Sequence, residues 1–230
     1  MSSEVEHIQA RYAKRKQLPE SLYNPLAPDV YLTRQEKERG FICWIRFSGM
    51  DPVQDKRVIE IGCGAGRNLL QFIQLGFRPE NLVGNELLEE RAVQARQVLP
   101  AHVRILVGDA ATVDFGGEQF DVVFQSTVFT SILDDAFQQK LADRMWTLVK
   151  SGGGVLWYDF IYNNPANLDV RGVPVRRVRA LFPEGDLKVW KLTLAPPISR
   201  RVTKIHPSCY TLFNLLPFLR THVLCWIKKT

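Results

Sequence analysis

Several features that mark other classes of protein are scarce or missing in this sequence. The four cysteines (Cys43, Cys63, Cys209 and Cys225) lie far apart and form no C-x-x-C pair, which disfavours a disulfide framework and a metal site. No apolar run approaches the roughly eighteen residues that a transmembrane helix needs. The first residues, MSSEVEHIQARYAKRKQ, mix both charges around no apolar core, so we expect no secretory signal and a cytoplasmic protein.

The composition that is present is typical of one α/β domain. A chain of 230 residues can bury a sizeable core, and 46% hydrophobic with 23% charged residues is ordinary for a globular protein. We therefore expect a single domain over residues 1–230. The net charge of +6 favours an anionic partner, although diffuse positive charge identifies none by itself.

Apolar strand-like runs alternate with helical patterns along the chain. The runs lie at residues 58–61, 82–83, 103–107, 120–124 and 155–158. The helical patterns lie at residues 68–75, 89–98 and 136–149. Continuous apolar strands separated by helices predict a parallel sheet covered on both faces. The segment LVKSGGG, residues 148–154, is expected to end the third of these helices in a glycine C-cap.

The stretch VIEIGCGAGRNLL, residues 58–70, predicts a strand, a glycine turn and a helix that hold a nucleotide-like cofactor. Its glycines are Gly62, Gly64 and Gly66, whereas the dinucleotide spacing G-x-G-x-x-G requires a glycine where Arg67 stands. Glu60 lies two residues before the turn and would repel a pyrophosphate. S-adenosylmethionine carries an ammonium and a sulfonium, so it suits this carboxylate better.

Further polar residues follow the next strands at their carboxyl ends, where α/β proteins bind ligands. Glu86 ends the second strand, twenty residues after Gly66, and is placed to accept both ribose hydroxyls. Asp109 and Ala110 end the third strand and suit an adenine ring, and Gln125 ends the fourth. Local roles stay open, such as a helix-start carboxylate for Glu86 and a turn cap for Asp109.

With these elements in order, the sequence resembles the class I S-adenosylmethionine-dependent methyltransferases over residues 58–159. The matching elements are E-x-G-x-G-x-G at 60–66, the acid Glu86, G-D-A at 108–110, F-D-V-V at 120–123 and L-V-K-S-G-G at 148–153. The resemblance implies a Rossmann-like, seven-stranded, mostly parallel sheet with helices on both faces. Residues 188–194 and 222–229 would be its last two strands, one of them antiparallel. The second-strand acid here is glutamate where many relatives have aspartate, and its extra methylene still reaches a ribose.

The resemblance also implies roles for individual residues. S-adenosylmethionine would be the cofactor. Glu86 would bind its ribose, and Asp109 with Ala110 its adenine. The remaining expected cofactor contacts are Glu60, Gly62, Gly64, Gly66 and Gln125.

The acceptor side is expected to be built from the two ends of the chain. Residues 1–50 predict a helical cap whose tyrosines, Tyr12, Tyr23 and Tyr31, either fold over the site as a lid or only pack. Residues 161–230 elaborate the other side of the cofactor-binding core at 58–160. Between residues 171 and 204, nine lysines and arginines face two acidic residues, so Arg171 is predicted to hold an anionic group on the acceptor. A solvated basic helix face is the alternative for the other cations.

Two residues are candidates for removing a proton from the acceptor. Asp159 ends the fifth strand, and His206 has the more suitable intrinsic pKa. Asp134 and Asp135 look instead like the start of a helix.

These observations favour a methyltransferase that acts on an oxygen of a small polar or anionic acceptor, such as a sugar, a glycan intermediate or a secondary metabolite. A nucleic-acid methyltransferase is the alternative, because the pI is about 9.2. The chain lacks the N-P-P-Y or D-P-P-Y signature of base methylation, so we do not expect a nucleic-acid acceptor. A cofactor-binding subunit without activity is disfavoured by the complete set of glycines and acids.

Overall fold

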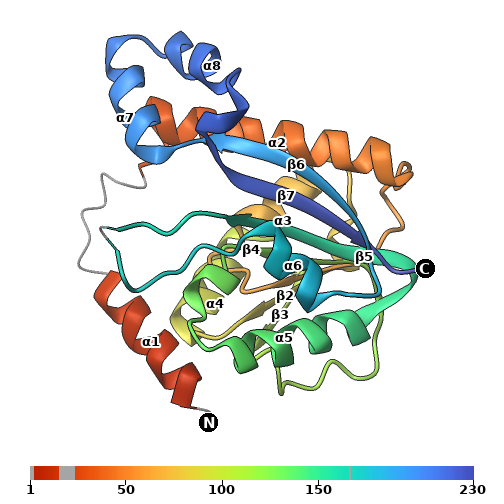
Figure 1. The fold of residues 1–230 in the computed structure, drawn as a ribbon. Helices are drawn as coiled ribbons and strands as arrows, with labels where there is room; N and C mark the ends of the chain where they lie inside the picture. Colours follow the sequence, from red (N-terminus) through yellow and green to blue (C-terminus); the bar gives the residue numbers. More distant parts are fainter. Residues whose placement is uncertain (1–2, 16–23, 166) are drawn as a thin grey trace.

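A seven-stranded sheet forms the centre of the structure, a computed structural model that describes residues 3–15, 24–165 and 167–230 (Figure 1). Its strands are β1 (Val58–Ile61), β2 (Leu82–Glu86), β3 (Arg104–Val107), β4 (Phe120–Ser126), β5 (Val149–Phe160), β6 (Asp186–Leu194) and β7 (Arg220–Lys228). They lie in the order β3-β2-β1-β4-β5-β7-β6. Among these described strands β7 runs opposite to the other six, so the predicted sheet is confirmed, including its last two strands.

Helices cover both faces of this sheet, as predicted. They are α1 (Ser3–Arg15), α2 (Pro28–Ser48), α3 (Arg67–Gln74), α4 (Glu89–Val98), α5 (Asp135–Leu148), α6 (Val175–Leu181), α7 (Pro196–Ile205) and α8 (Ser208–Asn214). One apolar layer joins the sheet to α1, α5 and α6, and a second joins it to α2, α3 and α4. None of the helices in the described part of the chain combines the length and apolar character that a bilayer span requires.

Side-chain alternation along the strands divides these two layers. In β5, Trp157 faces the α5 layer, whereas Leu156 and Tyr158 face the α2 layer. The α2 layer is held by aromatic contacts, and the rings of Phe41 and Phe72 stack with centroids 5.2 Å apart. Phe124 of β4 meets Phe72 edge-on at 5.4 Å.

The glycines after α5 do not cap that helix, so this prediction was wrong. The helix ends at Leu148, and the glycines that follow it belong to β5, which begins at Val149. A Cβ on Gly153 would lie 2.6 Å from the carbonyl oxygen of Asp121, and one on Gly154 would lie 2.6 Å from that of Ile227. The glycines are therefore needed because neighbouring backbones approach closely at this strand.

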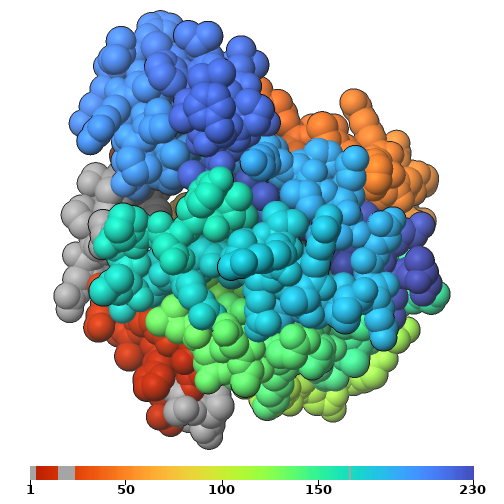
Figure 2. Space-filling model, viewed as in Figure 1, coloured from red at the N-terminus to blue at the C-terminus, as the bar shows by residue number. Residues whose placement is uncertain are grey.

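The two N-terminal helices lie apart rather than forming one cap: α2 covers one face of the sheet, and α1 lies beside the carboxyl ends of β2 and β3 (Figure 1). Val5 and Ile8 of α1 are buried in the α5 layer, and Phe41 and Trp44 of α2 are buried in the α2 layer. At the other end of the chain, α7 and α8 lie between β6 and β7. They form a lobe that projects away from the sheet beside the start of α2 (Figures 1 and 2).

Candidate functional site

The glycine turn between β1 and α3 forms the floor of the candidate site. Its three glycines have positive φ angles of 67° at Gly62, 57° at Gly64 and 77° at Gly66. A Cβ on Gly62 would lie 2.6 Å from Cγ2 of Val128, which follows β4. The turn therefore brings the ends of β1 and β4 close together and leaves backbone where side chains would otherwise stand.

Glu86 lies at the carboxyl end of β2 and connects to this turn. Its buried carboxylate accepts the amide of Gly64 at 2.7 Å through Oε2 and the amide of Leu88 at 3.0 Å through Oε1. The side chain thus braces the glycine turn and keeps its negative charge at the carboxyl edge of the sheet. This position is the one that the spacing predicted.

A chain of three polar residues, of which Glu60 is buried and Asn68 and Lys37 are half-buried, lies under the same turn on the α2 face. Asn68 donates to Oε1 of Glu60 at 2.5 Å, and Lys37 of α2 donates to Oδ1 of Asn68 at 2.5 Å. Oε2 of Glu60 is buried and has no hydrogen-bond partner in the part of the chain that the structure describes. Burial raises the pKa of Glu60 and lowers that of Lys37, because each charge is taken out of water.

Asp109 and Ala110, the residues predicted to bind adenine, follow β3, whose last residue lines a groove between α1 and the sheet edge. Asp109 accepts the amide of Ala111 at 2.9 Å, and Ala110 is buried. The groove has a volume of about 450 Å³. It is lined by Gln9 and Ala13 of α1 and by Leu87, Leu88, Glu89, Glu90 and Val107 near the ends of β2 and β3.

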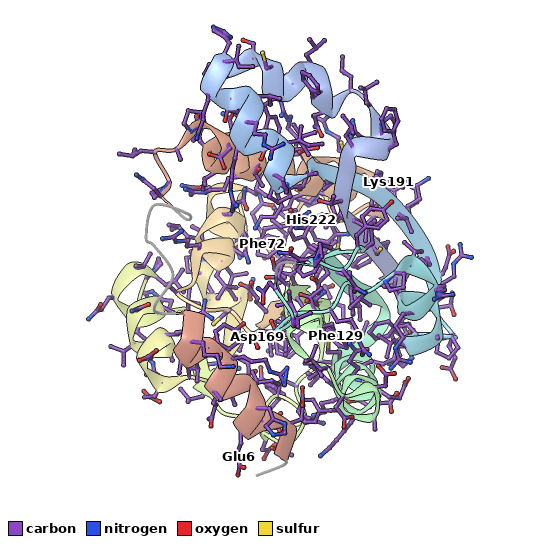
Figure 3. The ribbon with its side chains drawn as sticks, turned by 60° about the vertical axis from the view of Figure 1, so that its left-hand side comes forward. Glu6, Phe72, Phe129, Asp169, Lys191 and His222 are labelled. Carbon is purple, nitrogen blue, oxygen red and sulfur yellow. The ribbon has the colours of Figure 1, made fainter. Side chains whose placement is uncertain are left out.

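Helix α1 is fixed beside this groove by a buried ion pair. Arg11 contacts Glu4 at 2.9 Å and donates to the carbonyl of Ser131 at 2.9 Å, and Glu4 accepts the amide of Leu133 at 2.9 Å. The helix therefore docks on the segment that follows β4. In Figure 3 it crosses in front of the sheet, with Glu6 at its outer end.

Of the predicted lid tyrosines, the structure brings one to the site. The guanidinium of Arg91 lies 5.2 Å from the ring centroid of Tyr12, and the same guanidinium reaches Gly64. Tyr31 lies on α2, 52% exposed, and accepts a hydrogen bond of 3.0 Å from Gln35. Tyr23 lies outside the described residues.

The predicted acceptor-side residues converge on the loop after β4. Asp159 is fully buried and accepts the amide of Thr130 at 3.3 Å and that of Phe160 at 3.1 Å. Arg171 donates its amide to the carbonyl of Thr130 at 2.8 Å, while its guanidinium pairs with Asp135. Burial raises the pKa of Asp159 to about 7. These residues hold the loop in place from two sides.

Two other predicted residues make local contacts. Gln125 is fully buried and accepts the amide of Val128 at 3.0 Å, so it too fixes the loop after β4. His206 is exposed at the junction of α7 and α8, where its Nδ1 accepts the amide of Ser208 at 3.2 Å. The structure does not bring His206 together with Asp159.

A second cluster of polar side chains lies at the same edge of the sheet, on its α2 face. The hydroxyl of Tyr158 is 2.7 Å from that of Thr193, and the imidazole of His222 stacks on the Tyr158 ring at 5.3 Å. Nζ of Lys37 lies 5.4 Å from the centre of this ring. Burial and the charge of Lys37 lower the pKa of His222 to about 4. Figure 3 shows His222 inside the molecule and Lys191 of the adjoining strand pointing outward.

Comparison with known proteins identifies the fold and its family. A family model described as a methyltransferase domain matches residues 58–153. Magnesium protoporphyrin IX methyltransferase from Synechocystis PCC 6803, solved with S-adenosylmethionine bound, superposes with a TM-score of 0.66 at 11% identity, covering 100% of this chain and 99% of that one. The glycopeptide N-methyltransferase MtfA, in complex with sinefungin, gives a TM-score of 0.56 at 17% identity and coverages of 85% and 93%.

Residues 58–153 are therefore a methyltransferase domain, and the chain has the fold of a methyltransferase that binds S-adenosylmethionine. One curated relative, malonyl-[acyl-carrier protein] O-methyltransferase from Bacteroides fragilis (strain 638R), is 42% identical over 60 residues. That match covers 26% of this chain and only 12% of the relative.

In this methyltransferase, sequence reasoning missed Lys37 and His222. Their place in the candidate site depends on α2 crossing the sheet and on β7 running antiparallel, so that His222, near the start of β7, pairs with Phe160 at the end of β5. The available signal was the predicted last strand at residues 222–229, which begins with a histidine.

Proposed function

We propose that this methyltransferase transfers a methyl group from S-adenosylmethionine to an oxygen of a small polar or anionic acceptor. The observation that carries the proposal is the pair formed by Glu86 and the glycine turn, at the carboxyl edge of a sheet shared with proteins that bind this cofactor.

The glycine turn and the polar residues around it suit the parts of S-adenosylmethionine. The carboxylate of Glu86 would accept the ribose hydroxyls, and Asp109 with Ala110 would face the adenine. Glu60 has an unpartnered oxygen in a buried position, which suits the positive end of the methionine part. When bound, the cofactor supplies an electrophilic methyl group on a sulfonium.

The chain itself has to exclude water and align the acceptor, since these are the main sources of acceleration in methyl transfer. Helix α1 flanks the groove beside β2 and β3, and the Glu4–Arg11 pair fixes it to the loop after β4. Asp159, Gln125 and Arg171 hold that loop through Thr130 and Val128. These contacts would give the acceptor a rigid wall beside the reacting atoms.

Two groups are proposed for the acceptor proton. Asp159 remains a candidate general base, although opening of the loop around Thr130 is then required, because its oxygens accept backbone amides. His222 is the second candidate, since its low pKa keeps the imidazole neutral near pH 7. Lys37, close to His222, adds a positive charge that favours an anionic acceptor over a cationic one.

The test is a screen for release of S-adenosylhomocysteine by the purified full chain. Separate pools contain sugars, phenols, carboxylic acids, amines and RNA. Release with a hydroxyl or carboxylate pool, and loss of that release in Glu86→Ala, is the expected result. Release with the amine or RNA pool alone would overturn the proposed oxygen acceptor while keeping the family assignment.

A further inference from the structure

Exposed apolar side chains are concentrated on the α7–α8 lobe, defined here as residues 196–219. Among the described residues, thirteen large apolar side chains are exposed, and six of them fall within fourteen consecutive positions of the lobe. The six are Ile205, Leu212, Phe213, Leu215, Leu216 and Phe218. The exposed fraction reaches 81% at Ile205 and 72% at Phe218. Such clustering marks an interaction surface, whereas single exposed apolar residues need no explanation.

The inner side of the lobe is well anchored, so the outward residues are not left exposed by a loose segment. Tyr210 is fully buried and donates to Oε2 of Glu36 at 2.6 Å, and Asn214 donates to the other oxygen at 2.6 Å. Val202 of α7 and Tyr210 of α8 pack with Leu194 at the end of β6. The lobe therefore presents its leucines and phenylalanines from a fixed base.

The charge of this part of the chain has one sign. Residues 187–230 contain eight lysines and arginines and no aspartate or glutamate. On α7, Arg201 and Lys204 are exposed beside the apolar residues, and Asp29 of α2 reaches Arg200 at 3.8 Å. Arg201 and Lys204 form no ion pair within the described part of the chain, and a projecting surface with leucine and phenylalanine next to such cations is complementary to an anionic bilayer interface.

We propose that the α7–α8 lobe docks on the surface of an anionic lipid membrane. Leu212, Leu215 and Phe218 would enter the boundary between headgroups and acyl chains, and Arg201 and Lys204 would contact the anionic headgroups. An RNA partner would match the cations but leave the leucines and phenylalanines unused. The shape also favours a membrane, because the lobe projects as a knob beside the body of the protein (Figure 2).

Vesicle co-sedimentation of the full chain tests this docking. Vesicles of phosphatidylcholine alone are compared with vesicles that also contain phosphatidylglycerol. We expect binding to the anionic vesicles, weakened by added salt. The double variant Leu215→Asp/Phe218→Asp should lose at least tenfold in partitioning, because two apolar side chains no longer enter the interface.

Matched controls separate the lobe from general surface effects. Arg201→Gln/Lys204→Gln should lose on the order of twentyfold, since each cation near an anionic surface contributes about a factor of five. Arg176→Gln/Arg179→Gln on α6 removes the same charge elsewhere, and Leu168→Asp changes an apolar residue that is 85% exposed elsewhere. Both controls should bind as the unaltered chain does, and thermal unfolding checks that every variant folds.

Two results would overturn the proposal. One is equal partitioning of the unaltered chain and the lobe variants. The other is a concentration-dependent dimer in sedimentation velocity, abolished by Leu215→Asp/Phe218→Asp, without vesicle binding; the lobe would then bind a second copy of the chain. Neither readout requires methyl transfer, so the outcome is independent of the proposed acceptor.

Discussion

The amide of Gly64 donates a 2.7 Å hydrogen bond to Oε2 of Glu86, across the 22 residues that separate the glycine turn from the end of β2. This bond joins the two sequence elements on which the cofactor assignment depends. It places a buried carboxylate beside backbone that carries no side chain, an arrangement suited to a ribose next to a closely approached cofactor.

Replacing Glu86 with alanine should weaken binding of S-adenosylhomocysteine by about 1.5–3 kcal/mol, the usual contribution of hydrogen bonds to a charged group. Isothermal titration calorimetry measures the loss. Glu80→Ala is the matched control, because that carboxylate lies just before β2, away from the carboxyl end of the strand, and is exposed. Equal losses in the two variants would remove Glu86 from the binding site.

The glycine turn allows steric overlap to be separated from backbone conformation. Gly62 and Gly116 have φ angles of 67° and 63°, but a Cβ at Gly116 meets nothing within 4 Å. Alanine at Gly116 should therefore cost about 1–2 kcal/mol of unfolding free energy for the left-handed conformation. Alanine at Gly62 should cost more, because it also overlaps Val128.

Urea unfolding measures both values, and cofactor binding should fall only for Gly62→Ala. Val128→Ala in the Gly62→Ala background should recover part of the extra loss. If Gly62→Ala and Gly116→Ala are equally stable, the close approach of Val128 is not a constraint on the turn.

The buried carboxyl of Asp159 should make stability depend on pH. Its pKa rises from the usual 3.8 to about 7 on folding, so the folded state holds the proton more tightly. That contribution is complete below about pH 4 and is lost as the pH rises through 7. Relative to Asp159→Asn, the unfolding free energy of the unaltered chain should fall by ~2–4 kcal/mol across this range.

Urea titrations from pH 4 to 8 check this slope, with Asp55→Asn as an exposed control.

The Asp159→Asn variant also tests the role of Asp159 in catalysis. A general base contributes about 10²–10⁴-fold, so methyl transfer should fall by that factor if Asp159 takes the proton. A few-fold change would restrict Asp159 to holding Thr130.

Features that depend on residues close together in the sequence were predicted correctly, whereas those that depend on distant contacts were not. The strand, turn and helix around Gly62 are set by neighbouring residues, and Glu86 by the length of one β-α-β unit, so both were found in the sequence. The glycines of β5 were mistaken for a helix cap, because their role depends on the backbones of Asp121 and Ile227.

Long-range packing explains what else was missed. Lys37 reaches Asn68 only because α2 crosses the sheet, and His222 meets Tyr158 only through the antiparallel register of β7. The choice of His206 followed from its intrinsic pKa, which says nothing of its place at an exposed helix junction.

The two histidines make a direct comparison. His222→Asn should lower kcat/KM for the acceptor by about 10²-fold, the lower part of the range for a general base, with affinity for S-adenosylhomocysteine changed less than twofold. His206→Asn should leave both values unchanged. Steady-state kinetics with any acceptor found in the screen decides between them, and the reverse pattern would return His206 to the mechanism.

The cofactor assignment is tested most directly by calorimetric titration of the purified chain with S-adenosylhomocysteine and, separately, with NAD. The account predicts saturable binding of S-adenosylhomocysteine at one site per chain and no heat of binding from NAD. Glu60 would repel the pyrophosphate of NAD, and Arg67 stands where the dinucleotide-binding turn requires a glycine. Saturable binding of NAD, or no binding of S-adenosylhomocysteine by the folded chain, would contradict it.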